Sequence, residues 1–192
     1  MAQQPDLRPV LARTQEWVAD LVDGVRADQM QTRTPCAQWN VAELVEHLFA
    51  VEHRVAVLPE KGTVEDEPVA IPLPKDISAG FRDAVRRAQD AWADDAVMDA
   101  ELSPPWGTMP GRAVLGGYVQ EHLVHGWDLA SATGQDGEAL AEVSEQVLPM
   151  IKEFLPAETR SEDWIPFDAP VQPASDAGPT ERLANWLGRT TR

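Results

Sequence analysis

The chain has 192 residues, 43% of them hydrophobic, which is enough for a single globular domain with a sizeable core. It carries 32 acidic residues against 16 basic ones, which gives a formal net charge of −16 at pH 7. A surface with this charge repels nucleic acid and anionic membranes, so neither is expected as a partner.

Apolar residues at helical spacing dominate the first part of the chain. They predict a first helix over residues 6–27 and a second over 41–58. Asn40 followed by Glu43 is typical of a capping box at the start of the second helix. Residues 59–74 contain four prolines and a small acidic cluster, so we expect a long irregular linker there.

The next predicted helices are separated by one rigid loop. The spacing of apolar residues predicts a third helix over 76–97, followed by a loop rich in proline and glycine at 102–111. Thr108 as N-cap and Pro110 in the first turn are expected to start a fourth helix. This helix should stop near Gly134, because glycine is favoured just beyond a helix end.

The last part of the chain adds a fifth helix, predicted over 137–155, and a short one over 180–187. The sequence has no alternating strand pattern and no internal repeat. We therefore expect an all-α protein with a single domain spanning 1–192. Residues 1–158 should form a four-helix bundle with an extra helix, and residues 159–192 a C-terminal arm.

The fourth predicted helix carries polar residues on a side that should face the core. At about 100° per residue, Glu121 and His125 fall on the same side as its apolar residues. A buried carboxylate must be paired, hydrogen-bonded or bound to metal, because an isolated buried charge is very costly. The pair therefore predicts either a buried Glu–His hydrogen bond or two of the ligands of a metal ion.

A third ligand would come from another helix, and the chain offers only four histidines. His47 lies at the edge of the apolar stripe of the second helix, whereas His53 lies among polar residues. His47, Glu121 and His125 are thus the candidate ligands of a divalent metal with an open coordination position. Zinc is the expected ion, with nickel, iron and manganese as alternatives. For His47 alone, the alternative is a hydrogen-bonded histidine at the rim of the core.

Further side chains are candidates for the surroundings of this site. Asp128 follows His125 by about one turn and could accept the other ring N–H of a ligand histidine. The remaining candidates, which core packing or a surface position would explain as well or better, are His122, Trp39, Trp106 and Arg112.

The single cysteine, Cys36, excludes an intrachain disulfide. It is expected to fill space beside a helix start, with a redox or ligand role as the alternative. The chain start lacks the features of a secretory signal, and no apolar run approaches the roughly 20 residues of a membrane span. A cytoplasmic protein is therefore expected. A homodimer is one expected arrangement, since small bundles often pair.

Three segments are similar to a known family, the mycothiol-dependent maleylpyruvate isomerase N-terminal family of the DinB-like superfamily. The resemblance implies a DinB-like four-helix bundle whose divalent metal is held by His47, Glu121 and His125. It also implies an actinobacterial protein. The segments are TPCAQWNV (34–41) with LVEHL (44–48), WGTMPGRA (106–113) with EHLVHGWDLA (121–130), and the tail (177–189).

The resemblance implies a transferase or isomerase that acts on a small electrophilic substrate through a metal-bound thiolate, with mycothiol as co-substrate. The isomerase itself carries a separate C-terminal domain, whereas this chain has a short arm. The chain is therefore more similar to the short, uncharacterised metal-binding members of the family. A non-catalytic metal-binding or stress-response protein and a metal-dependent hydrolase remain alternatives.

Overall fold

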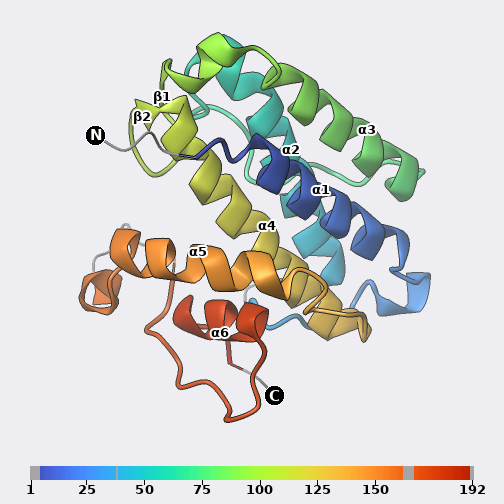
Figure 1. Ribbon diagram of the computed structural model, residues 1–192. Helices are drawn as coiled ribbons and strands as arrows, with labels where there is room; N and C mark the ends of the chain where they lie inside the picture. The colour runs from blue at the N-terminus through green and yellow to red at the C-terminus, as the bar shows by residue number, and fades with distance from the viewer. Residues whose placement is uncertain (1–4, 38, 162–166, 191–192) are drawn as a thin grey trace.

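The computed structural model describes residues 5–37, 39–161 and 167–190. α1 and α2 lie diagonally opposite each other, because each of them packs against both α3 and α4 (Figure 1). The predicted all-α class is confirmed. The four helices of the bundle are α1 (Arg8–Asp23), α2 (Val41–Lys61), α3 (Ile77–Ala91) and α4 (Gly111–Thr133).

Two further helices form a layer beside α4. α5 (Ala141–Phe154) and α6 (Pro179–Trp186) pack against each other and against α4 (Figure 1). Within the described ranges, no helix combines the length and the apolar character that a membrane span requires. Short 3₁₀ turns occur at η1 (Ala27–Gln29), η2 (Asp95–Met98) and η3 (Ala157–Ser161).

α4 is buried on nearly all of its sides, because the bundle covers one side and the α5–α6 layer covers another. Large side chains such as Tyr118 and Leu123 are almost completely inaccessible. The polar residues of the same helix are buried as well, including His122, His125 and Asp128. Each of these polar side chains therefore needs a partner inside the protein.

Two predicted helix boundaries are confirmed. The N–H of Glu43 donates to Asn40 Oδ1 at 3.0 Å, and the N–H of Asn40 donates to Glu43 Oε2 at 2.8 Å. These reciprocal bonds form the capping box of α2. At the end of α4, Gly134 adopts a left-handed conformation with φ 72°, and its N–H donates to the carbonyl of Ala130.

The start of α4 differs from the prediction. Its N-cap residue is Pro110, and the hydroxyl of Thr108 instead shares a hydrogen bond of 2.8 Å with the hydroxyl of Ser103. The chain stays extended as far as Pro110 because two short strands pair there in antiparallel fashion. The prediction of Thr108 as N-cap is therefore wrong. The two strands are β1 (Glu101–Leu102) and β2 (Met109–Pro110).

The third predicted helix, over 76–97, is interrupted. α3 ends at Ala91, and η2 follows as a separate turn. The side chain of Asp94 accepts a hydrogen bond from the N–H of Ala96 at 2.9 Å, so it caps a new turn. Aspartate competes for backbone N–H groups in this way and favours helix starts over helix interiors.

α2 extends beyond the predicted linker boundary and includes Pro59. A proline has no N–H to donate to the carbonyl four residues earlier, which is that of Val55. The indole N–H of Trp92 donates to this carbonyl at 2.9 Å instead. Because a side chain from beyond the end of α3 satisfies the carbonyl, the helix continues to Lys61.

We expect Trp92→Phe to lower the free energy of unfolding by about 1–3 kcal/mol, since the buried Val55 carbonyl then lacks a donor. Urea denaturation measures this change. Pro59→Ala restores a backbone N–H in register, so it should stabilise the Trp92→Phe variant more than it stabilises the wild type. Equal effects of Pro59→Ala in both backgrounds would contradict this explanation.

Candidate metal centre

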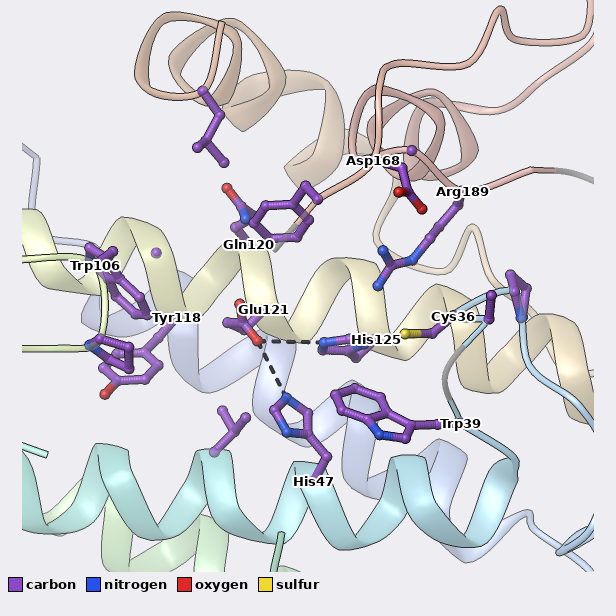
Figure 2. Close-up of a pocket in the computed structure, with 18 of the residues that line it drawn as sticks. Cys36, Trp39, His47, Trp106, Tyr118, Gln120, Glu121, His125, Asp168 and Arg189 are labelled. Atoms are coloured by element: carbon purple, nitrogen blue, oxygen red, sulfur yellow. Dashed lines mark ion pairs between the residues drawn. The ribbon is translucent and has the colours of Figure 1, made fainter. Parts of the chain in front are cut away.

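A cavity of about 860 Å³ lies beside α4, between α2 and the C-terminal segment, by which we mean residues 167–190. Its walls come from the connector before α2, α2 itself, Val69, the loop before α4, α4, and residues 154–155, 160, 167–169 and 188–190 near the C-terminus. Figure 2 shows His47 of α2 pointing toward Glu121 and His125 of α4 inside this cavity. The structure thus brings together the three side chains that the helical spacing selected as candidate ligands.

One carboxylate oxygen faces both imidazoles (dashed lines in Figure 2). Glu121 Oε2 lies 3.6 Å from His47 Nε2 and 3.5 Å from His125 Nε2. Both distances exceed those of ordinary N–H···O hydrogen bonds. A tetrahedral ion with bonds of about 2.0–2.2 Å holds its ligand atoms roughly 3.4 Å apart. The spacing therefore fits a bridging cation better than a direct Glu–His hydrogen bond.

The far side of each imidazole is fixed by a hydrogen bond. His47 Nδ1 donates to the carbonyl oxygen of Val69 at 2.9 Å. His125 Nδ1 donates to Asp128 Oδ2 at 3.1 Å. In a neutral ring, a proton on Nδ1 leaves Nε2 with a free lone pair, as a metal ligand requires. Both lone pairs then face the same carboxylate.

His47 Nε2 is buried and has no hydrogen-bond partner among the described residues. A buried polar atom without a partner is costly and calls for an explanation. A bound cation supplies one, because it would accept the lone pair of this nitrogen. The donor set of two imidazoles and one carboxylate suits zinc and related divalent ions.

Electrostatics favour the charged form of the carboxylate. Burial raises the pKa of Glu121, but the facing rings of His125 and His47 lower it by more, so its pKa lies well below the ordinary value. For His125, burial lowers the pKa, while Asp128 and Glu121 raise it by more. The site therefore concentrates negative charge around the imidazoles, which favours a cation between them.

Two tryptophans border the cavity. Trp39 stacks on the His47 ring, with centroids 4.4 Å apart and planes at 28°. Trp106 packs edge-on against Tyr118, with ring centroids 5.1 Å apart. A Cβ atom on Gly117 would lie 2.4 Å from the Trp106 ring, so glycine is what allows the indole to approach α4 this closely. Both indoles therefore have fixed positions.

Cys36 is buried, as expected of a residue that fills space. It also lines the cavity, and Figure 2 shows its sulfur pointing toward His125. Its sulfur lies within 4.8 Å of a ligand atom of both His125 and Asp128. The thiol therefore lies beside the candidate ligands without belonging to the triad.

The other two candidates lie elsewhere, which corrects the expectation that they border the pocket. His122 points away from it and contacts Glu52 Oε1 and the carbonyl of Tyr118, each at 2.7 Å. His122 therefore packs in the core, which is the other explanation that the sequence allows for it. Arg112 forms an ion pair with Asp99 near the start of α4. His122 directly follows Glu121 and therefore projects from a different side of α4. Arg112 lies at the start of the helix, nine residues before Glu121.

Two contributions to the site could not be found in the sequence. Val69 acts through its backbone carbonyl, and a carbonyl gives no side-chain signal. Arg189 donates to Asp128 from the C-terminal segment, with nitrogen–oxygen distances of 3.1 to 3.2 Å. The tail containing Arg189 belonged to the resemblance, but an isolated arginine in a tail does not reveal which acid it contacts.

Comparison with solved structures supports the predicted helical fold. Two solved structures, a mycothiol-dependent maleylpyruvate isomerase and a histidine-to-alanine variant of it, match with TM-scores of 0.62 and 0.61 at 16% identity. Each match covers 81% of this chain and 70% of the other chain. The predicted DinB-like helical bundle is thereby confirmed.

Sequence relatives cover nearly the whole chain. Two uncharacterized proteins from two strains of Mycobacterium tuberculosis are 30% identical over 187 residues, which is 96% of this chain and 99% of theirs. The sequence model of the mycothiol maleylpyruvate isomerase N-terminal domain matches residues 11–130, a range that includes most of α1, all of α2 and α3, most of α4 and all three convergent side chains. The protein is therefore a member of the mycothiol maleylpyruvate isomerase N-terminal domain family.

Proposed function

We propose that the protein binds a divalent metal, most simply zinc, through His47, Glu121 and His125, and uses it in reactions of mycothiol. The reaction class is thiol-dependent transfer or isomerisation. The observation that carries the metal site is the convergence of three ligand atoms around the buried, unpartnered Nε2 of His47. Membership in the family supports mycothiol as the co-substrate.

A divalent ion held there would deprotonate a coordinated thiol at neutral pH and keep it as a nucleophilic thiolate. The chain supplies the remaining parts of the site. Hydrogen bonds from the Nδ1 atoms of His47 and His125 fix the direction of both Nε2 lone pairs. Three protein ligands leave room for a further ligand in the coordination sphere.

The cavity provides space for the thiol and a second small molecule. Its volume of about 860 Å³ lies within the usual range of small-molecule sites, roughly 300–1,000 Å³. The indoles of Trp39 and Trp106 form apolar walls that would limit the access of water to the ligands. Exclusion of water protects a reactive thiolate from side reactions.

Cobalt-substituted protein tests the thiol step directly. Adding mycothiol should produce a sulfur-to-cobalt charge-transfer band in the near ultraviolet, because a thiolate then binds the ion. S-methylated mycothiol has no ionisable thiol and should give no band. If mycothiol gives neither a band nor heat of binding with the cobalt protein, the thiol function is wrong. Hydrolysis of model esters without any thiol would then favour the hydrolase alternative.

A further inference from the structure

The C-terminal segment places a buried arginine against the candidate metal centre. Arg189 is 8% exposed, and its partner Asp128 is 0% exposed. Arg189 Nε lies 3.2 Å from both carboxylate oxygens of Asp128, and Nη2 lies 3.1 Å from Oδ2. Two guanidinium nitrogens therefore donate to one carboxylate, which fixes the orientation of the carboxylate and stabilises its negative charge.

The same carboxylate holds a candidate ligand. Asp128 Oδ2 accepts both from Arg189 and from Nδ1 of His125, at 3.1 Å in each case. The opposite ring nitrogen of His125 faces Glu121 Oε2. A continuous chain of contacts thus leads from the C-terminal segment to the ligand atoms, and Figure 2 shows Arg189 reaching toward His125.

Arg189 is itself held firmly by α6. Its backbone N–H donates to the carbonyl of Ala184, and its carbonyl accepts from the side chain of Asn185, both at 2.9 Å. Gly188 turns the chain between α6 and Arg189 with φ 84°, a conformation that suits glycine. Because α6 packs on α4, these hydrogen bonds connect the Arg189–Asp128 contact to both helices.

We propose that Arg189 is a positioning residue of the metal centre, acting through Asp128 on the ring of His125. The inference rests on the proposed metal site and extends it to the C-terminal segment. The match to the family's sequence model ends at residue 130, so Arg189 lies outside the range that identifies the family. The C-terminal segment thus contributes a residue that supports the metal centre.

A consequence concerns the C-terminal segment itself. Coupling between two sites is reciprocal in binding free energy. If docking of Arg189 strengthens metal binding, metal binding must strengthen docking of residues 184–190. Zinc should therefore slow amide hydrogen exchange in this segment of the wild-type protein.

The test compares Arg189→Met with Arg189→Lys. Zinc affinity is measured by chelator competition on protein shown to be folded by circular dichroism. Loss of a partner behind a metal ligand typically costs about 10–100-fold in affinity, so we expect that loss for Arg189→Met and partial recovery for Arg189→Lys. The cobalt absorption spectrum should shift in Arg189→Met, because the geometry of His125 changes.

A double variant separates positioning from general destabilisation. Asp128→Asn removes the contact from the other side, so Arg189→Met should cause little further loss of zinc affinity in that background. Arg26→Met is the matched control, because the exposed Arg26 forms an ion pair with the exposed Asp28, far in the sequence from the candidate ligands. This control should bind zinc as the wild type does.

The outcomes distinguish the two proposals. A wild-type protein that binds no zinc overturns the metal site itself. Wild-type zinc affinity and an unchanged cobalt spectrum in folded Arg189→Met overturn the positioning role alone. Should Arg189→Met not fold, hydrogen exchange decides, because a zinc-bound wild type with unchanged exchange at residues 184–190 contradicts the inference.

Discussion

Replacing His47 by alanine is expected to lower the affinity of the protein for zinc by more than about a hundredfold. Changes to residues that merely support a metal ligand cost about 10–100-fold, and the loss of a ligand exceeds that. Glu121→Gln keeps the shape of the side chain but removes its charge, so a loss of similar size is expected. Chelator competition and elemental analysis of purified protein measure both effects.

His53→Ala is the matched control, because it removes a histidine from the same helix. His53 shares a hydrogen bond of 2.6 Å with Glu67 and does not line the cavity. Its removal should leave zinc affinity unchanged. Equal zinc affinities of the wild type and His47→Ala, or equal losses in His47→Ala and His53→Ala, would exclude the assigned ligands.

Removing His122 should have the largest effect on stability. The ring faces two acceptors, the carbonyl of Tyr118 and the carboxylate of Glu52, so both of its nitrogens carry protons. The side chains of His122 and Glu52 are completely buried, and the amide of Gln15 also donates to this carboxylate, at 2.8 Å. His122→Leu should cost about 3–5 kcal/mol, because it leaves a buried carboxylate without its charged partner.

The double variant Glu52→Leu with His122→Leu is the informative comparison. It should be more stable than His122→Leu alone, because no unpaired charge is left in the core. Urea denaturation of both variants measures the difference. If the double variant is less stable than His122→Leu, the unpaired carboxylate of Glu52 is not what destabilises His122→Leu.

The same pair predicts a dependence of stability on pH. Burial has the largest single effect and lowers the pKa of His122. The charge and hydrogen bond of Glu52, the carbonyl of Tyr118 and the charge of Glu121 together raise it by more, so the net pKa lies above its ordinary value. The stabilising contribution is then fully present below about pH 6.5, the ordinary histidine value, and is lost as the pH rises through the raised pKa. Relative to the double leucine variant, the wild type should therefore lose stability as the pH increases from 6.5.

Helical periodicity was sufficient to select the three candidate ligands. Glu121 and His125 lie one turn apart on one helix, so their spacing alone places them on the same side. His47 could be added because His53, on the same helix, lies off the apolar stripe. The sequence could not show whether the three side chains meet, since this depends on how α2 and α4 pack.

Contacts between distant segments could not be predicted in the same way. The sequence places His122 off the side of Glu121, but it does not reveal that α2 brings Glu52 to that position. Arg189 is 61 residues from Asp128 in the chain, and no periodicity links them. The position of Thr108 was misjudged because the pairing of two short strands outweighs its local preference for capping.

Anomalous diffraction at the zinc edge, from crystals of the zinc-loaded protein, tests the metal centre most directly. The predicted result is one strong anomalous peak about 2.0–2.2 Å from His47 Nε2, Glu121 Oε2 and His125 Nε2. A density map without a peak among these atoms, or with its only strong peak at Cys36 or elsewhere, would contradict the proposed centre.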